Sequence, residues 1–324
     1  MKAVIYTHYG CPDVLQLKEI DKPQPEDNEV LIKVHATTVN RTDNATTKAI
    51  PFFARPITGW FKPKKQTPGT EFSGEVEAIG KDVSSLKVGD RVFGFNDLGS
   101  RAQAEYLTIS AEYATTIPEG ISYKQAAASS EGAHYAHTFL KKVDIQAGQD
   151  ILVYGASGGI GSAAVQLLKT LDVHVTAVCG TRNVELMKSI GADHVIDYTR
   201  EDITKGQKKY HHIFDAVGKV SFFKCWRVLL PGGVYISSDL GFLGQNLLLP
   251  LITPLIKPLI GNKKAVFPLP TDIPGSLALI KRLMAEGRFT PIIDREFPLE
   301  NIVEAYRYVE KEHKTGNVVV NILP

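Results

Sequence analysis

The segment from Ile151 to Ser162 constrains the fold of this chain more than any other, because an apolar strand runs directly into a glycine-rich turn and a helix. It reads Ile-Leu-Val-Tyr-Gly-Ala-Ser-Gly-Gly-Ile-Gly-Ser. In such a turn Gly158 lets bare backbone approach a phosphate group, and Gly161 lets the helix pack close to the strand. The unpaired amides of the first helical turn then face the anion. The segment therefore predicts a binding site for the pyrophosphate of a dinucleotide.

The match to the dinucleotide-binding pattern G-x-G-x-x-G is incomplete, since Ala156 stands at the first glycine position. The following helix carries an inward-facing apolar stripe, made by Ala164, Val165, Leu167 and Leu168. The alternative is an ordinary glycine-rich βα turn that binds no ligand. We favour the binding site because the strand, the turn and the helix follow in the order that the pattern requires.

The rest of the chain predicts two domains, because 324 residues exceed the size at which single cores stop growing, roughly 250 to 300 residues. The first third predicts an antiparallel, barrel-like domain of short strands between Gly, Pro, Asp and Asn turns. These strands are expected at 30–36, 74–79, 90–94 and 104–108.

From residue 121 onward helices alternate with strands, which is the order of a doubly wound parallel sheet. The helices are expected at 123–142, 160–171 and 183–190, and the strands at 151–154, 173–178, 194–196, 212–217 and 234–237. A last helix near 274–286 precedes two strand-like pieces, 291–297 and 318–323. We expect these final strands to return to the first domain.

The charge balance points to no polyanionic partner. A net charge of +2 and an isoelectric point near 8.2 give no bias toward nucleic acid or a membrane surface. The three cysteines, Cys11, Cys179 and Cys225, are scattered and lack C-x-x-C spacing, which predicts a reduced, cytoplasmic protein. Because strand-like alternation begins at Met1, we expect no signal peptide.

The apolar stretch from Leu240 to Ile256 raises the question of a membrane span. Pro250, Pro254 and Pro258 each remove a backbone donor, so we expect no spanning helix. We expect this stretch to cover a subunit interface or the mouth of a substrate cleft.

The end of the second strand of the parallel sheet indicates which nicotinamide cofactor fits. In an NAD-binding unit an acidic residue about 20 residues beyond the glycines holds the ribose 2′-hydroxyl. Here Cys179 takes that place, at 179 − 158 = 21 residues after Gly158, and Gly180, Thr181 and Arg182 follow it. Gly180 leaves room for a 2′-phosphate, Thr181 can donate a hydrogen bond to it and Arg182 can pair with it, so the sequence predicts NADPH. The alternative for Arg182 is a solvated cation that caps the next helix.

Tyr198 follows the next strand and can donate its hydroxyl to the same phosphate or stack on the adenine. The alternative is a packed surface aromatic. Arg182 and Tyr198 together support NADPH more strongly than either does alone.

Together with the N-terminal strands, these motifs resemble the zinc-less quinone oxidoreductase (zeta-crystallin-like) branch of the medium-chain dehydrogenase/reductase superfamily. The resemblance covers nearly the whole chain and rests on motifs at 39–43, 68–76, 86–94, 104–106, 155–161, 191–193, 195–198 and 215–218. It implies an α/β protein with a GroES-like β-barrel catalytic domain, residues 1–123 and 288–324, and a Rossmann NADPH-binding domain, residues 124–287. It also implies a homodimer, in which 264–268 forms a strand that extends the Rossmann sheet across the two-fold axis.

The resemblance also assigns residues to the parts of the cofactor. These are Ser157, Gly158, Gly159 and Ile160 for the pyrophosphate, Thr181, Arg182 and Tyr198 for the adenosine phosphate, and Gly218 and Leu240 for the nicotinamide half. Asn40 matches a family asparagine near the nicotinamide riboside, which makes it a candidate for the catalytic site. The alternative is a loop asparagine that bonds its own turn.

We expect no metal. Asn40 and Thr70 stand where zinc-dependent relatives carry a cysteine and a histidine, and three dispersed cysteines could not build a four-cysteine zinc lobe. His134 and His137 have an i, i+3 spacing, but on a helix at the domain boundary we do not expect them to bind a metal ion.

Without a Lewis acid alcohol oxidation is the harder reaction, whereas hydride delivery to an electron-poor acceptor stays feasible. A small apolar quinone or α,β-unsaturated carbonyl compound accepts hydride at carbon and spreads the charge onto oxygen. Tyr135 stands where the family often carries a threonine beside the nicotinamide. We hypothesise that its phenol hydrogen-bonds the acceptor oxygen or donates a proton to it. The alternative is a tyrosine that packs between domains.

Four aromatic residues, Phe52, Phe53, Trp60 and Phe61, lie in a segment that lines the substrate cleft in the family, although a hydrophobic loop core would explain them as well. We expect Glu71 to be structural and Cys225 to be buried and inert.

The sequence thus predicts an NADPH-dependent quinone or enone reductase. An alcohol dehydrogenase of the same fold should need zinc, and an enoyl-thioester reductase should need a basic entrance for the coenzyme phosphates. A further alternative is a cofactor-binding protein without turnover. The physiological acceptor is left open.

Overall fold

The computed structural model describes residues 1–324 except 53, 54, 98, 242, 243, 270 and 324, and it divides into two compact units. Unit 1 comprises Met1–Glu131 and Asp272–Pro324, and unit 2 comprises Gly132–Thr271. The boundaries expected at 123/124 and 287/288 differ from this division, because helix α9 (Ile273–Ala285) groups with unit 1. Lys281 of α9 donates a hydrogen bond to Thr116 Oγ1 at 2.6 Å, a tertiary contact that no local pattern predicts.

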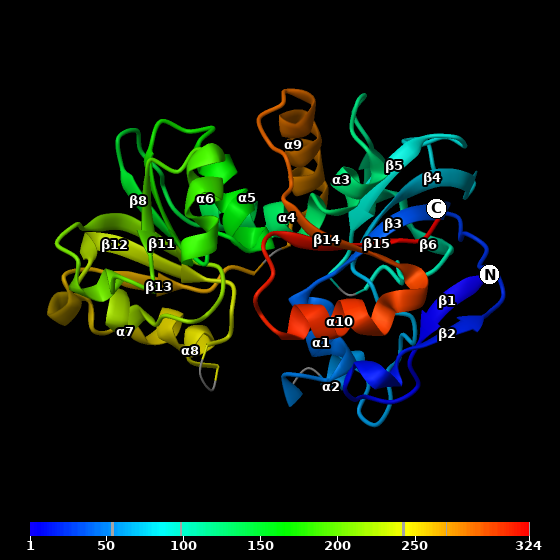
Figure 1. Cartoon of the computed structure of the whole chain (residues 1–324), viewed down its shortest axis with the longest axis horizontal. Coiled ribbons are helices and arrows are strands. Elements are labelled where there is room, and N and C mark those ends of the chain that lie inside the picture. Colours follow the sequence, from blue (N-terminus) through cyan, green and yellow to red (C-terminus); the bar gives the residue numbers. More distant parts are fainter. Residues whose placement is uncertain (53–54, 98, 242–243, 270, 324) are drawn as a thin grey trace. The chain divides into compact units, whose positions relative to one another are not determined.

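Unit 1 is built on a mainly antiparallel sheet with the strand order β14-β15-β3-β4-β5-β7, to which β6 adds by pairing with β3 (Figure 1). A separate two-stranded sheet holds β1 and β2. The strands of unit 1 are β1 (Lys2–Ile5), β2 (Gln16–Glu19), β3 (Glu29–Val39), β4 (Glu71–Ile79), β5 (Arg91–Phe95), β6 (Tyr106–Ser110), β7 (Ala114–Thr116), β14 (Ile293–Pro298) and β15 (Asn317–Asn321).

The long strand β3 has two partners along one edge: residues 29–33 pair with β6 and residues 36–39 pair with β15. Its other edge pairs with β4, with register shifts near Leu31 and Val34. The strand-rich first domain expected from the sequence is confirmed, and so is the return of the last two strands to it.

The helices of unit 1 are α1 (Arg41–Thr47), α2 (Arg55–Thr58), α3 (Tyr123–Ala127), α9 and α10 (Ile302–Glu310). Helix α10 buries one apolar stripe, made by Ile302, Ala305, Tyr306 and Val309, in a core that it shares with residues of β1 and β15. The spacing i, i+3, i+4, i+7 of this stripe is that of an amphipathic helix on a sheet.

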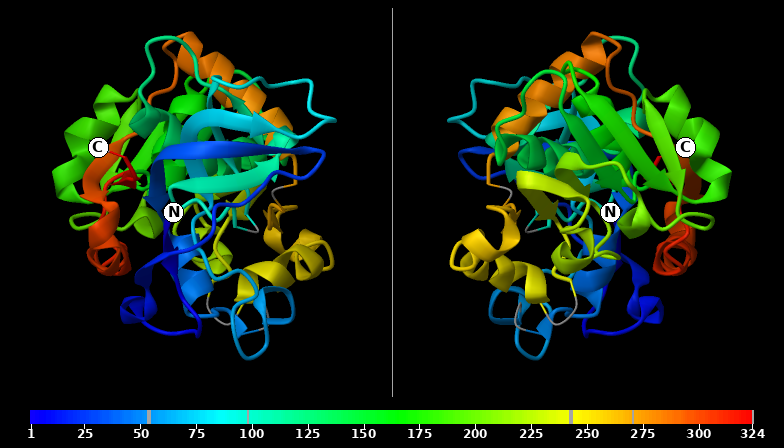
Figure 2. Two further views of the ribbon diagram at one scale, coloured as in Figure 1. Left: turned by 90° about the vertical axis from the view of Figure 1, so that its right-hand side faces the viewer. Right: turned by 90° about the vertical axis from the view of Figure 1, so that its left-hand side faces the viewer.

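Unit 2 is a six-stranded parallel sheet with the order β10-β9-β8-β11-β12-β13. Its strands are β8 (Asp150–Tyr154), β9 (His174–Cys179), β10 (His194–Asp197), β11 (Tyr210–Asp215), β12 (Leu229–Ser237) and β13 (Lys264–Val266). Its helices are α5 (Gly159–Leu168), α6 (Val184–Ser189), α7 (Phe222–Cys225) and α8 (Gln245–Ile252), and they cover both faces of the sheet (Figures 1 and 2). The strand order reverses between β8 and β11, and ligands of such sheets bind at the carboxyl ends of the strands at that point.

The helix expected over 123–142 is two helices, α3 and α4 (Ser130–Lys141). Ser122 begins α3 with a capping box to Gln125, and α3 ends at the C-cap Ala128. The sequence pattern missed this break because both helices contribute small or apolar residues on either side of it.

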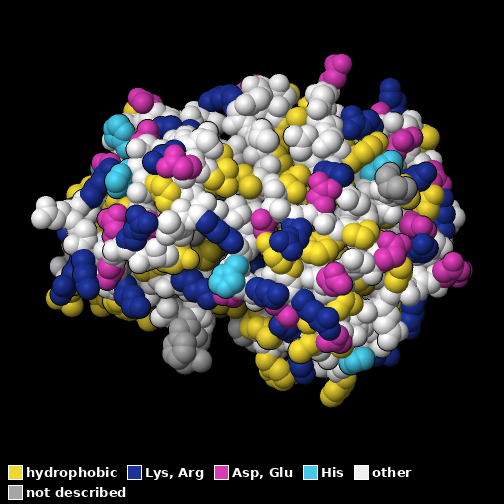
Figure 3. Space-filling model, in the orientation of Figure 1, with side chains coloured by type: hydrophobic (Ala, Val, Ile, Leu, Met, Phe, Trp, Pro, Cys, Tyr) yellow, Lys and Arg dark blue, Asp and Glu magenta, His cyan; other side chains and the backbone are white. Residues whose placement is uncertain are grey.

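The apolar stretch after β12 contains α8, and within the described part of the chain no helix is both long and apolar enough to cross a membrane. Several of its side chains are exposed, among them Leu251 at 70% and Leu255 at 81%. Elsewhere, acidic and basic side chains are interspersed over the face shown in Figure 3, which agrees with the even charge balance of the sequence.

Candidate functional site

The turn after β8 has the geometry expected of a phosphate-binding loop. Gly155 has a φ of +74°, which favours glycine, and Ala156 is fully buried, with its amide bonded to the carbonyl oxygen of Val178 at 3.0 Å. Gly158 is the N-cap of α5 and has no side chain to cap it, so the amides of the first turn are offered to a ligand. The alanine at the first glycine position thus packs into the sheet and leaves the turn open.

The glycines at 158 and 161 serve different purposes. A Cβ on Gly161 would lie 2.2 Å from the carbonyl oxygen of Gly155, so only glycine lets α5 approach β8 this closely. A Cβ on Gly158 would meet only Gly155 O, at 3.6 Å, so the space beside it is open to a ligand. The predicted packing role of Gly161 is confirmed, and the residues of the turn fit a pyrophosphate.

Gly132, which the sequence analysis did not single out, is a third glycine of this site. A Cβ on it would lie 2.8 Å from both the carbonyl carbon and the oxygen of Gly159, the first residue of α5. Helix α4 therefore packs directly on the glycine turn. Gly132 could have been noticed in the sequence, because it lies three residues before Tyr135, which the sequence analysis did consider.

The loop after β11 is held by a buried carboxylate. Asp215 Oδ1 accepts hydrogen bonds from the amides of Val217 and Gly218 at 3.1 and 2.9 Å, and its Oδ2 accepts one from the Tyr235 hydroxyl at 2.7 Å. Burial raises the pKa of Asp215 to about 6. Gly218 has a φ of +67°, and a Cβ there would lie 2.4 Å from Asp239 Cγ. These hydrogen bonds hold the loop after β11, which lies where the strand order of the sheet reverses, and Gly218 has no side chain there.

The ends of β9 and β10 meet where the adenosine phosphate was expected. Thr181 Oγ1 donates a hydrogen bond to Asp197 Oδ2 at 2.6 Å and lies 3.0 Å from Thr199 Oγ1. These hydrogen bonds, the one from Thr181 first, lower the pKa of Asp197, so the carboxylate is ionised. The Thr181 hydroxyl proton is therefore directed at Asp197, which the sequence analysis did not consider.

Arg182 and Tyr198 remain available at this end of the sheet. Arg182 is exposed, and Tyr198 is 58% exposed with its hydroxyl beside Gly180, 3.4 Å from the position of a Cβ there. The chain therefore offers a guanidinium and a phenol, both good partners for a phosphate.

In unit 1 Asn40 begins helix α1 and joins it to β4. Its Oδ1 accepts a hydrogen bond from the Asp43 amide at 2.8 Å, and its own amide donates to Asp43 Oδ2 at 3.1 Å, which makes a capping box. Its Nδ2 donates to Thr70 Oγ1 at 2.7 Å. Asn40 thus bonds its own turn, which is the alternative considered in the sequence analysis. It also holds the Thr70 side chain beside the start of α1.

Glu71 is a buried structural carboxylate. Its Oε1 accepts a hydrogen bond from the Glu131 amide at 2.6 Å and its Oε2 accepts one from Thr38 Oγ1 at 2.5 Å. Burial raises the pKa of Glu71, while Thr38 opposes that rise by bonding the ionised form. Glu71 therefore ties β4 to the first turn of α4.

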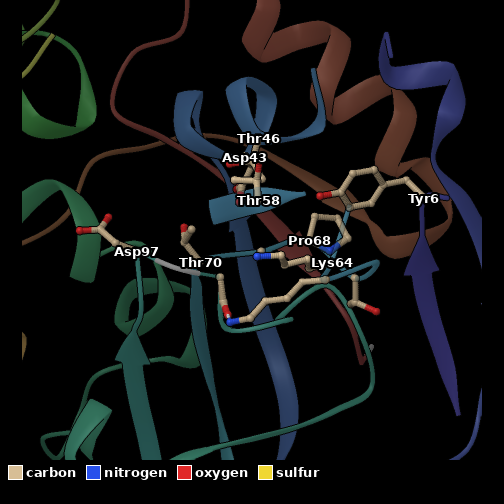
Figure 4. A pocket seen from close by; sticks show the side chains of 12 residues that line it. Tyr6, Asp43, Thr46, Thr58, Lys64, Pro68, Thr70 and Asp97 are labelled. Atoms are coloured by element: carbon tan, nitrogen blue, oxygen red, sulfur yellow. Dashed lines mark hydrogen bonds between the residues drawn. The ribbon is translucent and has the colours of Figure 1, made fainter. Parts of the chain in front are cut away.

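A cavity of about 260 Å³ lies within unit 1 (Figure 4). Its lining residues are Tyr6, Asp43, Thr46, Thr58, Lys64, Lys65, Thr67, Pro68, Gly69, Thr70, Asp97 and Gly99. Thr70, which bonds Asn40, links this cavity to the candidate site.

Of the four aromatics expected in the substrate cleft, the three that the structure describes do not line this cavity. Phe52, Trp60 and Phe61 are 64%, 55% and 95% exposed, and Phe53 lies outside the described residues.

The donor set at the zinc positions does not suit a zinc ion. Asn40 and Thr70 hydrogen-bond each other, and neither supplies the thiolate or imidazole that zinc sites use. Among the residues that the structure describes, no three His, Cys, Asp or Glu side chains gather in a way that could hold a metal ion.

Tyr135 and Cys225 complete the residues singled out from the sequence. Tyr135 is half-buried on α4, and its ring lies edge-on to His134 with the ring centroids 5.8 Å apart. Cys225 is fully buried, as expected, and burial raises the pKa of its thiol. Leu240 is half-buried, and its carbonyl oxygen accepts a hydrogen bond from the Asn246 amide.

Comparison with known proteins agrees with these features. Residues 26–119 match the family model of the alcohol dehydrogenase GroES-like domain, and residues 190–320 match that of a zinc-binding dehydrogenase. The chain is 32% identical, over its whole length and 80% of the relative, to the chloroplastic NADPH-dependent alkenal/one oxidoreductase of Arabidopsis thaliana. It is 34% identical to the chloroplastic quinone-oxidoreductase QR1 of Triphysaria versicolor, with 99% of this chain and 98% of the relative covered.

Among solved structures the quinone oxidoreductase of Coxiella burnetii matches with a TM-score of 0.85 at 27% identity, over 100% of this chain and 99% of that one. The Escherichia coli quinone oxidoreductase complexed with NADPH shares the fold, with a TM-score of 0.84 at 24% identity and 99% and 100% coverage. The chain belongs to the medium-chain dehydrogenase/reductase family, in its quinone oxidoreductase-like group.

Proposed function

We propose that this protein is an NADPH-dependent, zinc-independent oxidoreductase that reduces a quinone or an α,β-unsaturated carbonyl compound. The observation that carries the proposal is the glycine turn, where Gly158 and the first amides of α5 leave space for a pyrophosphate. Two relatives over the full chain support the acceptor class, since one is named for alkenals and enones and the other for quinones.

The choice of NADPH rests on the residues after β9. No carboxylate follows Cys179 directly, and the exposed Arg182 and Tyr198 offer a cation and a hydroxyl to a 2′-phosphate. The nearest carboxylate, Asp197, accepts hydrogen bonds from the hydroxyls of Thr181 and Thr199. We therefore propose that Thr181 contacts the 2′-phosphate through its backbone or positions neighbouring residues, and that its hydroxyl does not bond the phosphate.

Bound NADPH supplies a hydride to the electron-poor carbon of the acceptor, and a proton from solvent or from a side chain completes the reduction. We assign the proton donor or oxygen ligand to Tyr135, with its phenol half-buried on α4. Asn40 holds Thr70 and the first turn of α1, so we assign it to the organisation of the nicotinamide end of the site.

The test measures NADPH oxidation with a panel of quinones, alkenals, enones and enoyl thioesters, with NADH as the control cofactor. We expect turnover of quinones or enones with NADPH and at least tenfold lower kcat/KM with NADH. Tyr135→Phe should lower kcat with an enone by about 10²-fold, the low end of what general acid catalysis contributes. Turnover of primary alcohols but not of enones, or NADPH binding without any turnover, would refute the proposed activity.

We also propose a homodimer and a cytoplasmic location. The dimer proposal rests on β13, whose outer edge ends the six-stranded sheet at Lys264–Val266 and could pair with a second copy. The location proposal rests on three cysteines without close spacing, of which Cys179 and Cys225 are buried. Light scattering of the purified protein and fractionation of cells test the two points, and a monomer or an organellar pool would refute them.

A further inference from the structure

The segment 244–260 turns apolar side chains away from the core of unit 2. It contains α8 and the short helical turn Lys257–Ile260, and it lies next to β13 at the edge of that unit (Figure 1). On α8 the exposed side chains follow an i, i+4 spacing, so they share one side of the helix. Six leucine and isoleucine side chains of the segment are between 36% and 81% exposed, and we call them the apolar face: Leu247, Leu248, Leu251, Ile252, Leu255 and Leu259.

The opposite side of α8 holds the helix to unit 2, in part through polar groups. Asn246 Nδ2 donates a hydrogen bond to Asp239 O at 2.8 Å, and Thr253 Oγ1 accepts one from the Ala265 amide at 3.2 Å. Leu249 lies between these two contacts in the chain and is buried in the core. A surface helix normally buries its apolar side, whereas α8 exposes most of its leucines. A contiguous exposed apolar patch of this kind marks an interaction site.

The charge of the same segment is positive. Residues 240–271 contain three lysines and no acidic residue, although the whole chain has a net charge of only +2. Lys257 is exposed and lies between Leu255 and Leu259 in the chain. Burial and the charge of Lys209 lower the pKa of Lys263, so a further cation from outside the segment lies near it. The apolar face is therefore accompanied by cations within its own segment.

The composition of the apolar face argues against a second protein subunit as its cover. Protein interfaces favour Tyr, Trp, Phe, Met and Arg and are depleted of Lys, whereas this face has only leucine and isoleucine, with Lys257 among them. A two-fold interface would also bring Lys257 toward an equally positive surface of the other copy, and like charges repel. Aliphatic side chains beside lysines are instead typical of a helix that lies at the surface of a membrane with anionic lipids.

We infer that the apolar face binds the surface of a membrane that contains anionic phospholipids. The leucine and isoleucine side chains enter the boundary between the headgroups and the acyl chains, and Lys257 stays at the level of the lipid phosphates. The contact is peripheral, since the described residues contain no helix that is long and apolar enough to cross a membrane. The inference concerns a surface of the protein and does not depend on the proposed reaction.

The experiment is cosedimentation of the full-length protein with vesicles of phosphatidylcholine, either alone or mixed with phosphatidylglycerol. We expect binding to the mixed vesicles and at least tenfold weaker binding to phosphatidylcholine alone, because the lysines attract anionic lipid. Added salt should weaken binding to the mixed vesicles, since it screens this attraction. No binding of the wild-type protein to the mixed vesicles overturns the inference.

A serine variant tests the apolar part of the contact. Leu255→Ser should weaken binding to the mixed vesicles at least fivefold, because one side chain that enters the membrane is lost. Leu255 is 81% exposed, so the fold does not depend on it. The matched control is Leu171→Ser, which changes a 40% exposed leucine in the turn between α5 and β9, beside Asp172. An equal fall in the two variants contradicts the assignment of the apolar face.

A second pair of variants tests the charge. Lys257→Gln should weaken binding to the mixed vesicles about fivefold, which is the contribution of one lysine near an anionic membrane. Lys188→Gln removes the same charge from an exposed lysine of α6 that pairs with Glu185, and it should bind as the wild type does. Equal binding by these two variants removes Lys257 from the contact and overturns the electrostatic part of the inference.

Two further measurements separate a membrane from a second copy of the chain. The tryptophan emission of Leu255→Trp should shift to the blue when mixed vesicles are added, and that of Leu171→Trp should not, because only the former enters the membrane. Light scattering gives the oligomeric state of Leu255→Ser. A wild-type dimer that becomes a monomer in Leu255→Ser, with vesicle binding unchanged, assigns the apolar face to a second copy and overturns the inference.

Discussion

Separate alanine variants of Gly158 and Gly161 should fail in different ways, because the two glycines meet different neighbours. In Gly161→Ala the new Cβ would lie 2.2 Å from Gly155 O, whereas ordinary contacts begin at 3.4 Å, so backbone must move. Overpacking of this kind costs about 1–3 kcal/mol of stability. In Gly158→Ala the nearest atom is 3.6 Å away and φ is −80°, so the apoprotein should keep its stability.

Cofactor affinity should separate the two variants further. The methyl group of Gly158→Ala would occupy the space where the phosphate approaches, and losing one charge-assisted hydrogen bond of about 1.5–3 kcal/mol raises Kd roughly ten- to hundredfold. Urea denaturation of the apoproteins and fluorescence titration with NADPH measure both quantities. Wild-type affinity in Gly158→Ala would refute the phosphate site, and wild-type stability in Gly161→Ala would refute the close packing of α5 on β8.

Three further predictions follow from the same site. Asp215 has a folded-state pKa of about 6 against an ordinary 3.8, so protonation of its carboxyl group stabilises the fold fully below pH 4, and this stabilisation is lost as the pH rises through 6. The free energy of unfolding of the wild type should therefore fall by about 3 kcal/mol between pH 4 and 7, and that of Asp215→Asn should not. Parallel curves for the two proteins would contradict the argument. Gly132→Ala should weaken NADPH binding at least fivefold, because its Cβ would lie 2.8 Å from Gly159 O; unchanged Kd by fluorescence titration would disprove this contact. Arg182→Ala should raise Kd for NADPH about tenfold and leave Kd for NADH unchanged, and an equal effect on both cofactors would remove Arg182 from the phosphate site.

The sequence predicted those parts of the site that depend on residues close together in the chain, and missed those that depend on contacts between distant residues. The turn from Gly155 to Gly161 and the strand before it are set by neighbouring residues, so apolar alternation and glycine spacing predicted them. The carboxylate beside Thr181 went unnoticed, because Asp197 reaches it only through the parallel pairing of β9 and β10. The grouping of α9 with unit 1 was likewise not visible locally, since its contact with Thr116 joins residues 165 positions apart.

The sequence alone determined the Rossmann sheet, the GroES-like strands, the family resemblance and the glycine turn, because each depends on periodicity or on backbone freedom at a few adjacent positions. Only the tertiary structure decided the environment of single polar groups. It buried Asp43 and raised its pKa to about 8, and it joined Asn40 to Thr70. Burial and partnership are properties of residues brought together from distant segments, and these determine the chemistry that a site can carry out.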